Sequence, residues 1–391
     1  MRKGWEMKKL GDIADVEYGY TDISTDIGDY RYVRITDINN NGLLASTEKK
    51  YIRHTNEAKS FILNDYDLLM ARTGATFAKV LLYREFEPSV FASYLIRIKF
   101  KEKIENILYW YFTKSSTYWE QAINLSSGAA QPHFNGKALK QVVFSYPKSL
   151  SEQQRIVSII DKCFTAIDQA KSIAEQNLKN AKELFERLLQ KYFTNRNEGW
   201  EEKKLIEVAE YFNGLTYSPK NVSDKGIIVL RSSNIQNDKL DFFDIVRVDV
   251  SVKEKIIVRE GDILMCSRNG SQRLVGKTAR IENLSEQMTF GTFMMIIRSE
   301  YNPYLLWFFK SMNFKSQISG GENTMINQIT RYMLDDVVIS FPPLEKLKEI
   351  VNQLDAINLE TQKLENKYKK KIDDLEELKK SILQKAFSGE L

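Results

Sequence analysis

The sequence predicts an α+β protein built from two tandem copies of one unit, in which a globular α/β head is followed by a long helix. Three observations support this prediction. The heptapeptide GWEMKKL at residues 4–10 returns as GWEEKKL at residues 199–205. Further matches follow in the same order at an offset of about 195 residues. Two long segments without glycine or proline carry the same apolar heptad pattern.

The internal matches also indicate where each copy begins and ends. The clearest pairs are FASYLI (91–96) with FGTFMM (290–295), VVFSYP (142–147) with VVISFP (337–342), and LSEQQRIVSIID (150–161) with LEKLKEIVNQLD (344–355). Matches in one order at one offset do not arise by chance. We therefore expect a first head at residues 1–149, a central helix at 150–197, a second head at 198–343 and a C-terminal helix at 344–391.

Each head mixes short β-like runs with turn signals and some helical stretches. IIVLRSSNI (227–235) and GDILMCSR (261–268) are bounded by glycine or polar residues, as strands usually are. ILYWYFTKSSTYWEQAINL (107–125) has helical spacing and ends at SSG, which is a stop signal for a helix. FSYP and ISFP each close a β-like run, and their proline marks the break between strand and helix.

The segments 151–195 and 344–387 contain neither glycine nor proline, so each predicts one helix of about 40 residues, or about 60 Å. Ser151 is a candidate N-cap of the first helix, with Gln154 at the capping-box spacing. Apolar or small residues recur at 4-3 intervals and form a seam in both helices. The predicted interface positions are Ile156, Ile160, Ile167, Leu184, Leu188, Ile350, Leu354, Leu364, Leu375, Leu378 and Ile382.

A helix of this length with one apolar stripe needs a partner, and the two copies can supply one another. Small residues, Ala170 and Ala174, lie mid-seam in the first helix, and bulky Leu364 and Tyr368 lie mid-seam in the second. This match fits parallel and antiparallel pairing alike. We favour an antiparallel two-helix coiled coil that separates the heads with pseudo-two-fold symmetry. A solvated helix packed on its own head is the alternative.

Charge, apolar run length and cysteine count limit the classes of protein to which this chain can belong. The net charge of +5 permits a polyanionic partner without demonstrating one. The longest apolar runs are far too short to cross a bilayer, so we expect no membrane association. The basic start MRKGWEMKK leads into LGDIADVE, which is unlike a signal peptide. Two cysteines, Cys163 and Cys266, cannot form a disulfide framework, and they fit a cytoplasmic protein.

Motifs for covalent chemistry are missing from the sequence. The only histidines, His54 and His133, have no partner motif, so neither predicts a catalytic or metal-binding role. No CxxC, HExxH, EF-hand or GxxxxGK[ST] pattern occurs, and nothing resembles the motifs by which amino-methyltransferases bind S-adenosylmethionine. We therefore expect no catalytic residue, no metal site and no cofactor in this chain.

Polar turns occupy matching places in the two copies and differ in identity. They gather Arg, Lys, Asn, Gln, Ser and Thr, the side chains that hydrogen-bond base edges and phosphates. Two copies with a shared scaffold and different polar turns would recognise two different sequences. Ordinary surface turns are the alternative. The candidate DNA-binding residues are Arg31, Arg34, Arg72, Thr73, Lys79, Gln131, His133, Asn135, Lys137, Arg231, Ser232, Asn234, Arg268, Asn269, Gln272, Arg273, Lys277, Asn327 and Arg331.

The sequence resembles the specificity subunits of type I restriction–modification systems. The resemblance covers the whole chain and rests on GWEMKKLGDIADVEYG, DLLMARTGA, PKSLSEQQRIVSIID, PPLEKLKEIVNQLDAI and LKKSILQKAFSGEL. Glu152 and Gln153 match a Glu-Gln pair of the family, whereas the second copy has Glu345 and Lys346, which leaves open the finer detail of that helix start.

The resemblance implies a function and a set of partners. Each head would be a target recognition domain for one half of a bipartite site in double-stranded DNA, and the long helices would be a rigid spacer between half-sites. Two methyltransferase (modification) subunits would dock on the chain and bring S-adenosylmethionine, so DNA methylation would be their activity. Restriction subunits would bring ATP and Mg²⁺. Two rival interpretations stay open: a single chain with its own nuclease or methylase activity, and a coiled-coil adaptor that binds only proteins.

Overall fold

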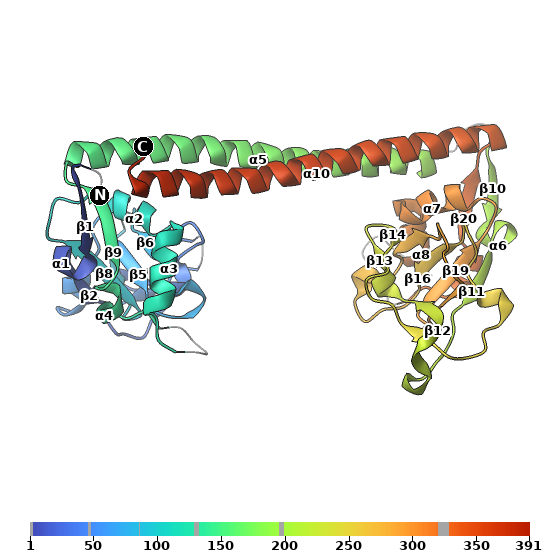
Figure 1. Cartoon of the computed structure of the whole chain (residues 1–391), viewed down its shortest axis with the longest axis horizontal. Helices are drawn as coiled ribbons and strands as arrows, with labels where there is room; N and C mark the ends of the chain where they lie inside the picture. The colour runs from blue at the N-terminus through green and yellow to red at the C-terminus, as the bar shows by residue number, and fades with distance from the viewer. Residues whose placement is uncertain (1–2, 46–47, 86, 129–132, 195–198, 320–327) are drawn as a thin grey trace. The chain divides into compact units, whose positions relative to one another are not determined.

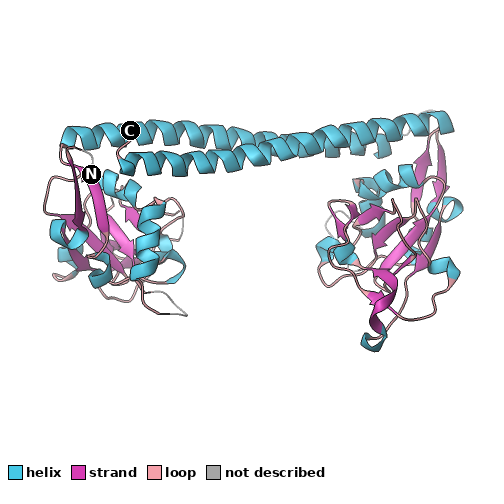
Figure 2. Ribbon diagram, in the orientation of Figure 1, coloured by secondary structure: helices cyan, strands magenta, loops and turns pink. Residues whose placement is uncertain are grey.

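The computed structural model describes residues 3–45, 48–85, 87–128, 133–194, 199–319 and 328–391. The chain divides into two compact units. Unit 1 combines Met1–Glu175 with Lys370–Leu391, and unit 2 is Gln176–Lys369. Each unit contains one head of mixed strands and helices, together with segments of two long helices (Figures 1 and 2).

Within its described residues, the first head contains two sheets, a two-stranded ribbon and four short α-helices. One sheet has the order β2 (Ala14–Tyr18), β8 (Leu95–Phe100), β5 (Leu68–Ala71), β6 (Val80–Leu82) and is antiparallel throughout. The other has the order β4 (Tyr51–Ile52), β3 (Tyr30–Val33), β7 (Ser89–Phe91), with β3 and β7 parallel. The ribbon pairs β1 (Trp5–Lys9) with β9 (Val143–Pro147). The helices are α1 (Leu10–Ile13), α2 (Asn106–Phe112), α3 (Ser116–Leu125) and α4 (Gly136–Leu139).

The second head repeats this plan in the same chain order. Its four-stranded sheet is β11 (Glu210–Asn213), β19 (Met294–Arg298), β16 (Ile263–Cys266), β17 (Thr278–Arg280), and its three-stranded sheet is β15 (Arg247–Val248), β12 (Val222–Leu230), β18 (Met288–Phe290). The ribbon pairs β10 (Glu201–Lys204) with β20 (Val338–Phe341), and a hairpin of β13 (Ile235–Gln236) and β14 (Lys239–Leu240) is added. The helices are α6 (Leu205–Val208), α7 (Asn302–Lys310), α8 (Met312–Ser319) and α9 (Arg331–Asp335). The predicted duplication and α+β class are confirmed.

The helical spacing expected over residues 107–125 is confirmed, and the segment forms two helices, α2 and α3. Ser115 starts the second helix: its Oγ accepts a hydrogen bond of 3.3 Å from the backbone N–H of Tyr118. A serine here can bond the backbone and so favours a new helix start over continuation. All five residues from Leu108 to Phe112 are buried, because α2 packs between the head and the long helices.

The long helices are α5 (Leu150–Thr194) and α10 (Leu344–Ser388), each 45 residues long. The predicted N-cap Ser151 is wrong by two positions. The helix begins at Leu150, and Ser149 caps it, since its Oγ accepts a 3.4 Å bond from the N–H of Glu152. In the part of the chain that the structure describes, no helix has the length and apolar character needed to cross a bilayer.

In each unit, segments of α5 and α10 run antiparallel. In unit 1, Lys171 on α5 bonds Glu376 on α10 at 2.5 Å, and Asp168, one turn earlier, pairs with Lys379, one turn later. In unit 2, Lys182 pairs with Glu365 at 3.8 Å, and Tyr192 donates a 2.6 Å hydrogen bond to Gln353. Positions that rise along α5 therefore fall along α10, and the predicted direction is confirmed within each unit.

The predicted seam positions near the helix starts are buried, whereas three other predicted positions are exposed. Ile156, Ile160, Ile167, Ile350 and Leu354 are buried, and Leu188, Leu375 and Ile382 are partly buried. Leu184, Leu364 and Leu378 are instead 65%, 42% and 47% exposed.

The residue after each of these leucines takes its place. The ring of Phe185 lies 5.7 Å from the ring of Trp307 in the second head. At this position the apolar stripe of α5 therefore faces that head. On α10, Glu365 and Lys379 enter the seam, with side chains only 22% and 19% exposed, and reach their ion-pair partners at its edge.

Candidate nucleic-acid interface

In each head, one arginine follows a central strand and is fixed beside an aromatic turn. We use "aromatic turn" for residues 92–95 in the first head and 291–294 in the second. Each is closed by a 2.8 Å hydrogen bond from its fourth N–H to its first carbonyl. The N–H of Arg72, which follows β5, donates to the carbonyl of Tyr94 at 3.0 Å. The N–H of Arg268, near the end of β16, donates to the carbonyl of Phe293 at 3.1 Å.

A close approach at a glycine holds each aromatic turn in place. A Cβ added at Gly19 would lie 2.3 Å from the carbonyl oxygen of Ala92, and one added at Gly214 would lie 2.1 Å from that of Gly291. The residue after each glycine donates a backbone hydrogen bond to the last residue of the strand before the turn. Only glycine fits here, because any side chain would collide with the backbone. The glycines matched in the two copies therefore position the same turn.

A third segment joins the arginine in both heads. The N–H of Phe134 donates to the carbonyl of Arg72 at 3.0 Å, which brings exposed His133 and Lys137 beside Arg72 and Thr73. In the second head, Arg268 forms an isolated antiparallel β-bridge with Gln328. The N–H of Ile329 donates to the carbonyl of Ser267 at 2.7 Å, close in sequence to exposed Arg331. Three segments distant in sequence thus converge in each head, as a reading surface made of loops requires.

The arginine side chains are oriented by aromatic rings. The Arg72 guanidinium lies 4.8 Å above the ring of Tyr18, and its Nη1 donates to the carbonyl of Ser93 at 3.3 Å. The Arg268 guanidinium lies 5.6 Å from the centre of the Phe293 ring. A guanidinium that lies near an aromatic ring can still direct its remaining N–H groups to a guanine edge or a phosphate.

Two hollows lie beside the aromatic turn of the second head. One, of about 530 Å³, is lined by Arg268, Asn269, Gly270, Gln272 and Phe293. The other, of about 760 Å³, is lined on its polar side by Thr216, Arg231 and Ser232. Asn269 links the two, because its Nδ2 donates to Ser232 Oγ at 2.9 Å. Most of the polar residues predicted for the second head therefore share one surface, and Arg273 is exposed on the same loop.

Several predicted DNA-binding residues instead hold the fold together. Arg31 is 2% exposed and its Nη1 donates to Glu85 at 2.8 Å, so its prediction as a base-reading group is wrong. Asn234 is 1% exposed; its amide donates to two carbonyls and its oxygen accepts from the Arg231 N–H, so this prediction is also wrong. Arg34 pairs with Asp37, three residues on, at 3.0 Å.

Three further candidates take part in local structure. Asn135 caps α4 by accepting a 2.9 Å bond from the Ala138 N–H. Lys79 donates to Asn40 at 2.8 Å, and Lys277 donates to the carbonyl of Ile235 at 3.1 Å, so both lysines are turned toward their own heads. These contacts explain the matching positions of the two lysines without DNA. Gln131 and Asn327 lie outside the described residues.

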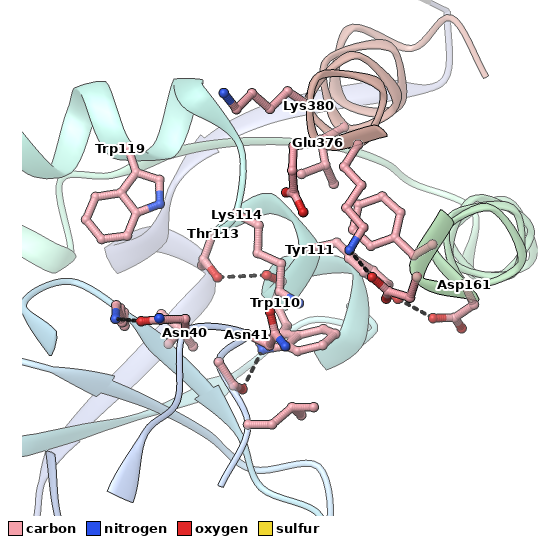
Figure 3. A pocket seen from close by; sticks show the side chains of 18 of the residues that line it. Asn40, Asn41, Trp110, Tyr111, Thr113, Lys114, Trp119, Asp161, Glu376 and Lys380 are labelled. Atoms are coloured by element: carbon pink, nitrogen blue, oxygen red, sulfur yellow. Dashed lines mark hydrogen bonds and ion pairs between the residues drawn. The ribbon is translucent and has the colours of Figure 1, made fainter. Parts of the chain in front are cut away.

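The first head meets both long helices at a cavity of about 430 Å³ (Figure 3). Trp110 forms part of its lining, and the Lys114 ammonium lies 3.2 Å from the centre of the indole ring. Burial, together with the smaller effect of the charge on nearby Lys379, lowers the pKa of Lys114 to about 7. Tyr111 donates a hydrogen bond to Asp161 of α5, which fastens α2 to the helix.

A related junction occurs in the second head, with different hydrogen-bond partners. Trp307 donates from Nε1 to Asp355 of α10 at 2.9 Å, and the Lys310 ammonium lies 4.7 Å from its ring. Lys310, however, has a carboxylate partner, Asp238, at 3.0 Å. These junctions connect head and helix and do not share residues with the arginine-bearing surfaces. Among the described residues, no group of three or more His, Cys, Asp or Glu side chains could hold a metal ion.

The sequence matches a family model twice, at the two repeats. The model is described as the type I restriction modification DNA specificity domain, and it matches residues 2–177 and 197–374. The matches cover most of the chain, so the chain belongs to this family, as the resemblance predicted.

Curated relatives agree with this assignment. The type I restriction enzyme EcoKI specificity subunit of Escherichia coli (strain K12) is 28% identical over 203 residues, covering 50% of this chain and 44% of that protein. The putative type I restriction enzyme MjaX specificity subunit of Methanocaldococcus jannaschii is 30% identical over 207 residues, covering 49% and 46%. Each alignment therefore spans less than half of the relative's length.

Solved structures show the same fold. The HsdS subunit from Thermoanaerobacter tengcongensis matches with a TM-score of 0.62 and 19% identity, over 100% of this chain and 98% of its own. A chain from a study of complex assembly and conformational transition in the type I R-M system matches with a TM-score of 0.82 and 19% identity, over 100% and 99%.

Proposed function

We propose that this chain is the DNA sequence-specificity subunit of a type I restriction–modification complex, and that it reads a bipartite target in double-stranded DNA, one half with each head. The observation that carries the proposal is the repeated surface: the same arginine, aromatic turn and third segment recur in both heads, with different polar residues around them. A shared frame with different hydrogen-bonding groups suits two different half-sites.

The proposal gives the chain partners as well as a target. Two methyltransferase subunits would dock on it, one for each repeat, and would bring S-adenosylmethionine. Restriction subunits would bring ATP and Mg²⁺. The chain itself would be non-catalytic and would act in the cytoplasm, where DNA is accessible. The chemistry of methylation or cleavage would then belong to the partners, and this chain would decide where on the DNA it happens.

Binding should depend on salt as well as on sequence. The chain has a net charge of +5, and exposed cations such as Lys137 and Arg331 lie on the proposed surfaces. Contacts to phosphates release counterions, so the affinity should fall as salt rises. The base-reading side chains should determine the ratio of specific to non-specific binding.

The test is reconstitution of the chain with modification subunits from the same source. Genomic DNA without this methylation is incubated with the complex and S-adenosylmethionine, and the methylated adenines are mapped by sequencing. Methylation confined to one bipartite sequence is the expected result. Methylation by the chain alone would instead support a single-chain enzyme, and a complex whose methylation shows no sequence preference would refute the proposal in favour of an adaptor.

A further inference from the structure

Tyr94 and Phe293 occupy equivalent places in the two aromatic turns, and both rings lie largely in solvent. Tyr94 is 57% exposed and Phe293 is 55% exposed. One exposed aromatic residue needs no explanation on a protein surface. Here the exposure recurs in both copies, FASYLI and FGTFMM, although the flanking residues differ. The repeat therefore presents an aromatic ring twice, at the same point of the frame.

Hydrogen bonds fix the backbone of each aromatic turn, while the aromatic side chain stays exposed. Each turn is closed by its own 2.8 Å hydrogen bond, and the carbonyl of its aromatic residue accepts from the arginine N–H. The carbonyl of Phe293 accepts a second bond, from Ser267, at 2.9 Å. The backbone of the glycine opposite, Gly19 or Gly214, lies directly against the turn. Because the backbone of the turn is already ordered, binding through its aromatic residue costs little further backbone entropy.

The surroundings of Phe293 point to a nucleic-acid base as the ligand. The ring forms part of the lining of both hollows. Arg268, Asn269 and Gln272 line one of them, and Ser232 lines the other together with Arg231, which is paired with Asp244 at 2.7 Å. An apolar ring flanked by such groups fits the edge of a base pair, where a thymine methyl group lies next to donors and acceptors. Because the Arg268 guanidinium already lies near the Phe293 ring, an edge contact fits better than insertion of the ring between stacked bases.

We propose that Tyr94 and Phe293 are specificity-determining residues, and that each contacts a base edge of the half-site read by its own head. This inference rests on the proposed function. The two rings differ by one hydroxyl group, which can donate or accept a hydrogen bond in the first head and is missing in the second. Phe293 would prefer an apolar group such as the thymine methyl, whereas Tyr94 would combine apolar contact with a hydrogen bond.

The experiment uses the full chain in complex with the modification subunits, with unmethylated genomic DNA as the probe. The variants are Phe293→Ala and Tyr94→Ala. The controls are Met312→Ala and Met7→Ala, which truncate residues of the same heads with similar exposure, 53% and 56%, on α8 and β1. Methylated sites are recovered by sequencing, and base preference is compared position by position.

Phe293→Ala should lower the preference at one position, or two adjacent positions, of one half-site by about tenfold, which is the usual effect of one lost base contact. The other half-site, read in the same molecules, should be unchanged. Tyr94→Ala should do the same to the opposite half-site, and the two controls should change neither.

Unchanged preferences in both alanine variants would overturn the inference, and so would an equal loss at both half-sites. If the wild-type complex itself selects no sequence, the proposed function fails instead, so the two failures are distinguishable. Tyr94→Phe provides a second test that is safe for folding, because it removes only the hydroxyl. It should shift the preference at the position identified with Tyr94→Ala, and no shift there would contradict a hydrogen bond from the hydroxyl.

Discussion

The guanidinium of Arg298 binds the carboxylate of Asp262 with two hydrogen bonds, from Nε to Oδ1 at 2.9 Å and from Nη2 to Oδ2 at 2.7 Å. Asp262 is 2% exposed, and Arg298 also lies over the ring of Phe212. The first head has the same device in Arg97, which is 2% exposed and binds both Glu17 and Asp67. In each head the arginine lies on one strand of the four-stranded sheet, β19 or β8, and the aspartate directly precedes the neighbouring strand, β16 or β5. The ion pair therefore links two adjacent strands.

Removal of this arginine should strongly destabilise the second head. Arg298→Met leaves the Asp262 charge buried without its partner, so the free energy of unfolding should fall by about 3–5 kcal/mol. Urea denaturation with circular dichroism measures the change. The double variant Arg298→Met, Asp262→Leu removes both charges and should recover most of the loss. A single variant as stable as the wild type would contradict this account.

Substitution of the glycine beside an aromatic turn should disturb that turn specifically. Gly214→Ala places a Cβ 2.1 Å from the Gly291 carbonyl oxygen, so we expect a lower melting temperature and a loss of about 2 kcal/mol or more. The matched control is Gly291→Ala in the same turn, whose added Cβ would lie 3.7 Å from Val229, an ordinary contact. Differential scanning calorimetry of both variants checks this. Equal effects would show that the close approach is unimportant.

The partly buried Lys114 of the first head should make stability depend on pH. The folded-state pKa of Lys114 is lowered to about 7, whereas an unfolded lysine titrates near pH 10.4. Between these values the unfolded state binds a proton that the folded state lacks, so the free energy of unfolding rises with pH. Below about pH 7 both states are charged, and the full cost of burying that charge remains.

Lys114→Met should therefore flatten this pH dependence and stabilise the protein at pH 6 by about 1–3 kcal/mol. Urea midpoints at pH 6 and pH 9 provide the comparison. Lys310→Met serves as the control, because that lysine is paired with Asp238 and its removal should not stabilise the protein at pH 6. If Lys114→Met is destabilising at pH 6, the lysine contributes more through its contact with Trp110 than its burial costs.

Arg268→Ala should relax recognition of one half-site and leave the other unchanged. Loss of one bidentate base contact weakens discrimination by about 1–3 kcal/mol. Arg72→Ala is the matched variant in the first head and should affect the opposite half-site. Competition binding of the reconstituted complex with duplexes altered in one half-site at a time measures both effects. An equal loss at both half-sites for Arg268→Ala would point to a structural role.

Longer helices should change the spacer of the DNA target without changing the half-sites. This prediction depends on the proposed role of α5 and α10 as the element that sets the spacing. One heptad inserted after Gln176 in α5 and one after Lys370 in α10 keeps the seam in phase. Seven residues add about 10.5 Å, or roughly three base pairs. Methylated sites with an unchanged gap would refute this role.

The elements with regular sequence patterns were predictable, and side-chain roles were less so. The duplication, the long helices and the strands before them follow from matches and periodicity. The seam positions were harder to assign, because at each helical turn either of two adjacent residues can occupy the seam. Leu364 is more apolar than Glu365, yet the stem of Glu365 is buried while its carboxylate reaches Lys182. Hydropathy alone cannot express that arrangement.

The roles of polar residues in the heads were also hard to predict from sequence alone. Arg31 and Arg268 look alike in sequence, and only the fold reveals that Glu85 neutralises the first while the second is exposed. Arg34 with Asp37 and Arg231 with Asn234 did carry a warning in their three-residue spacing, which is typical of a capping interaction. The aromatic pair Tyr94 and Phe293 was also detectable, because the two residues align within the repeat; a search for hydrogen-bonding side chains passes over them.

Unit 1 is completed by residues 370–391, which lie more than two hundred positions beyond its head. Leu383 and Ala386 belong to the same apolar core as Trp5 and Phe144, and they are 4% and 0% exposed. During translation the first head therefore leaves the ribosome with part of its core open to water, and this surface can be covered only after the second repeat has been synthesised. Premature termination would damage the earliest part of the chain as well as the last, and chaperones have a long interval in which to bind it.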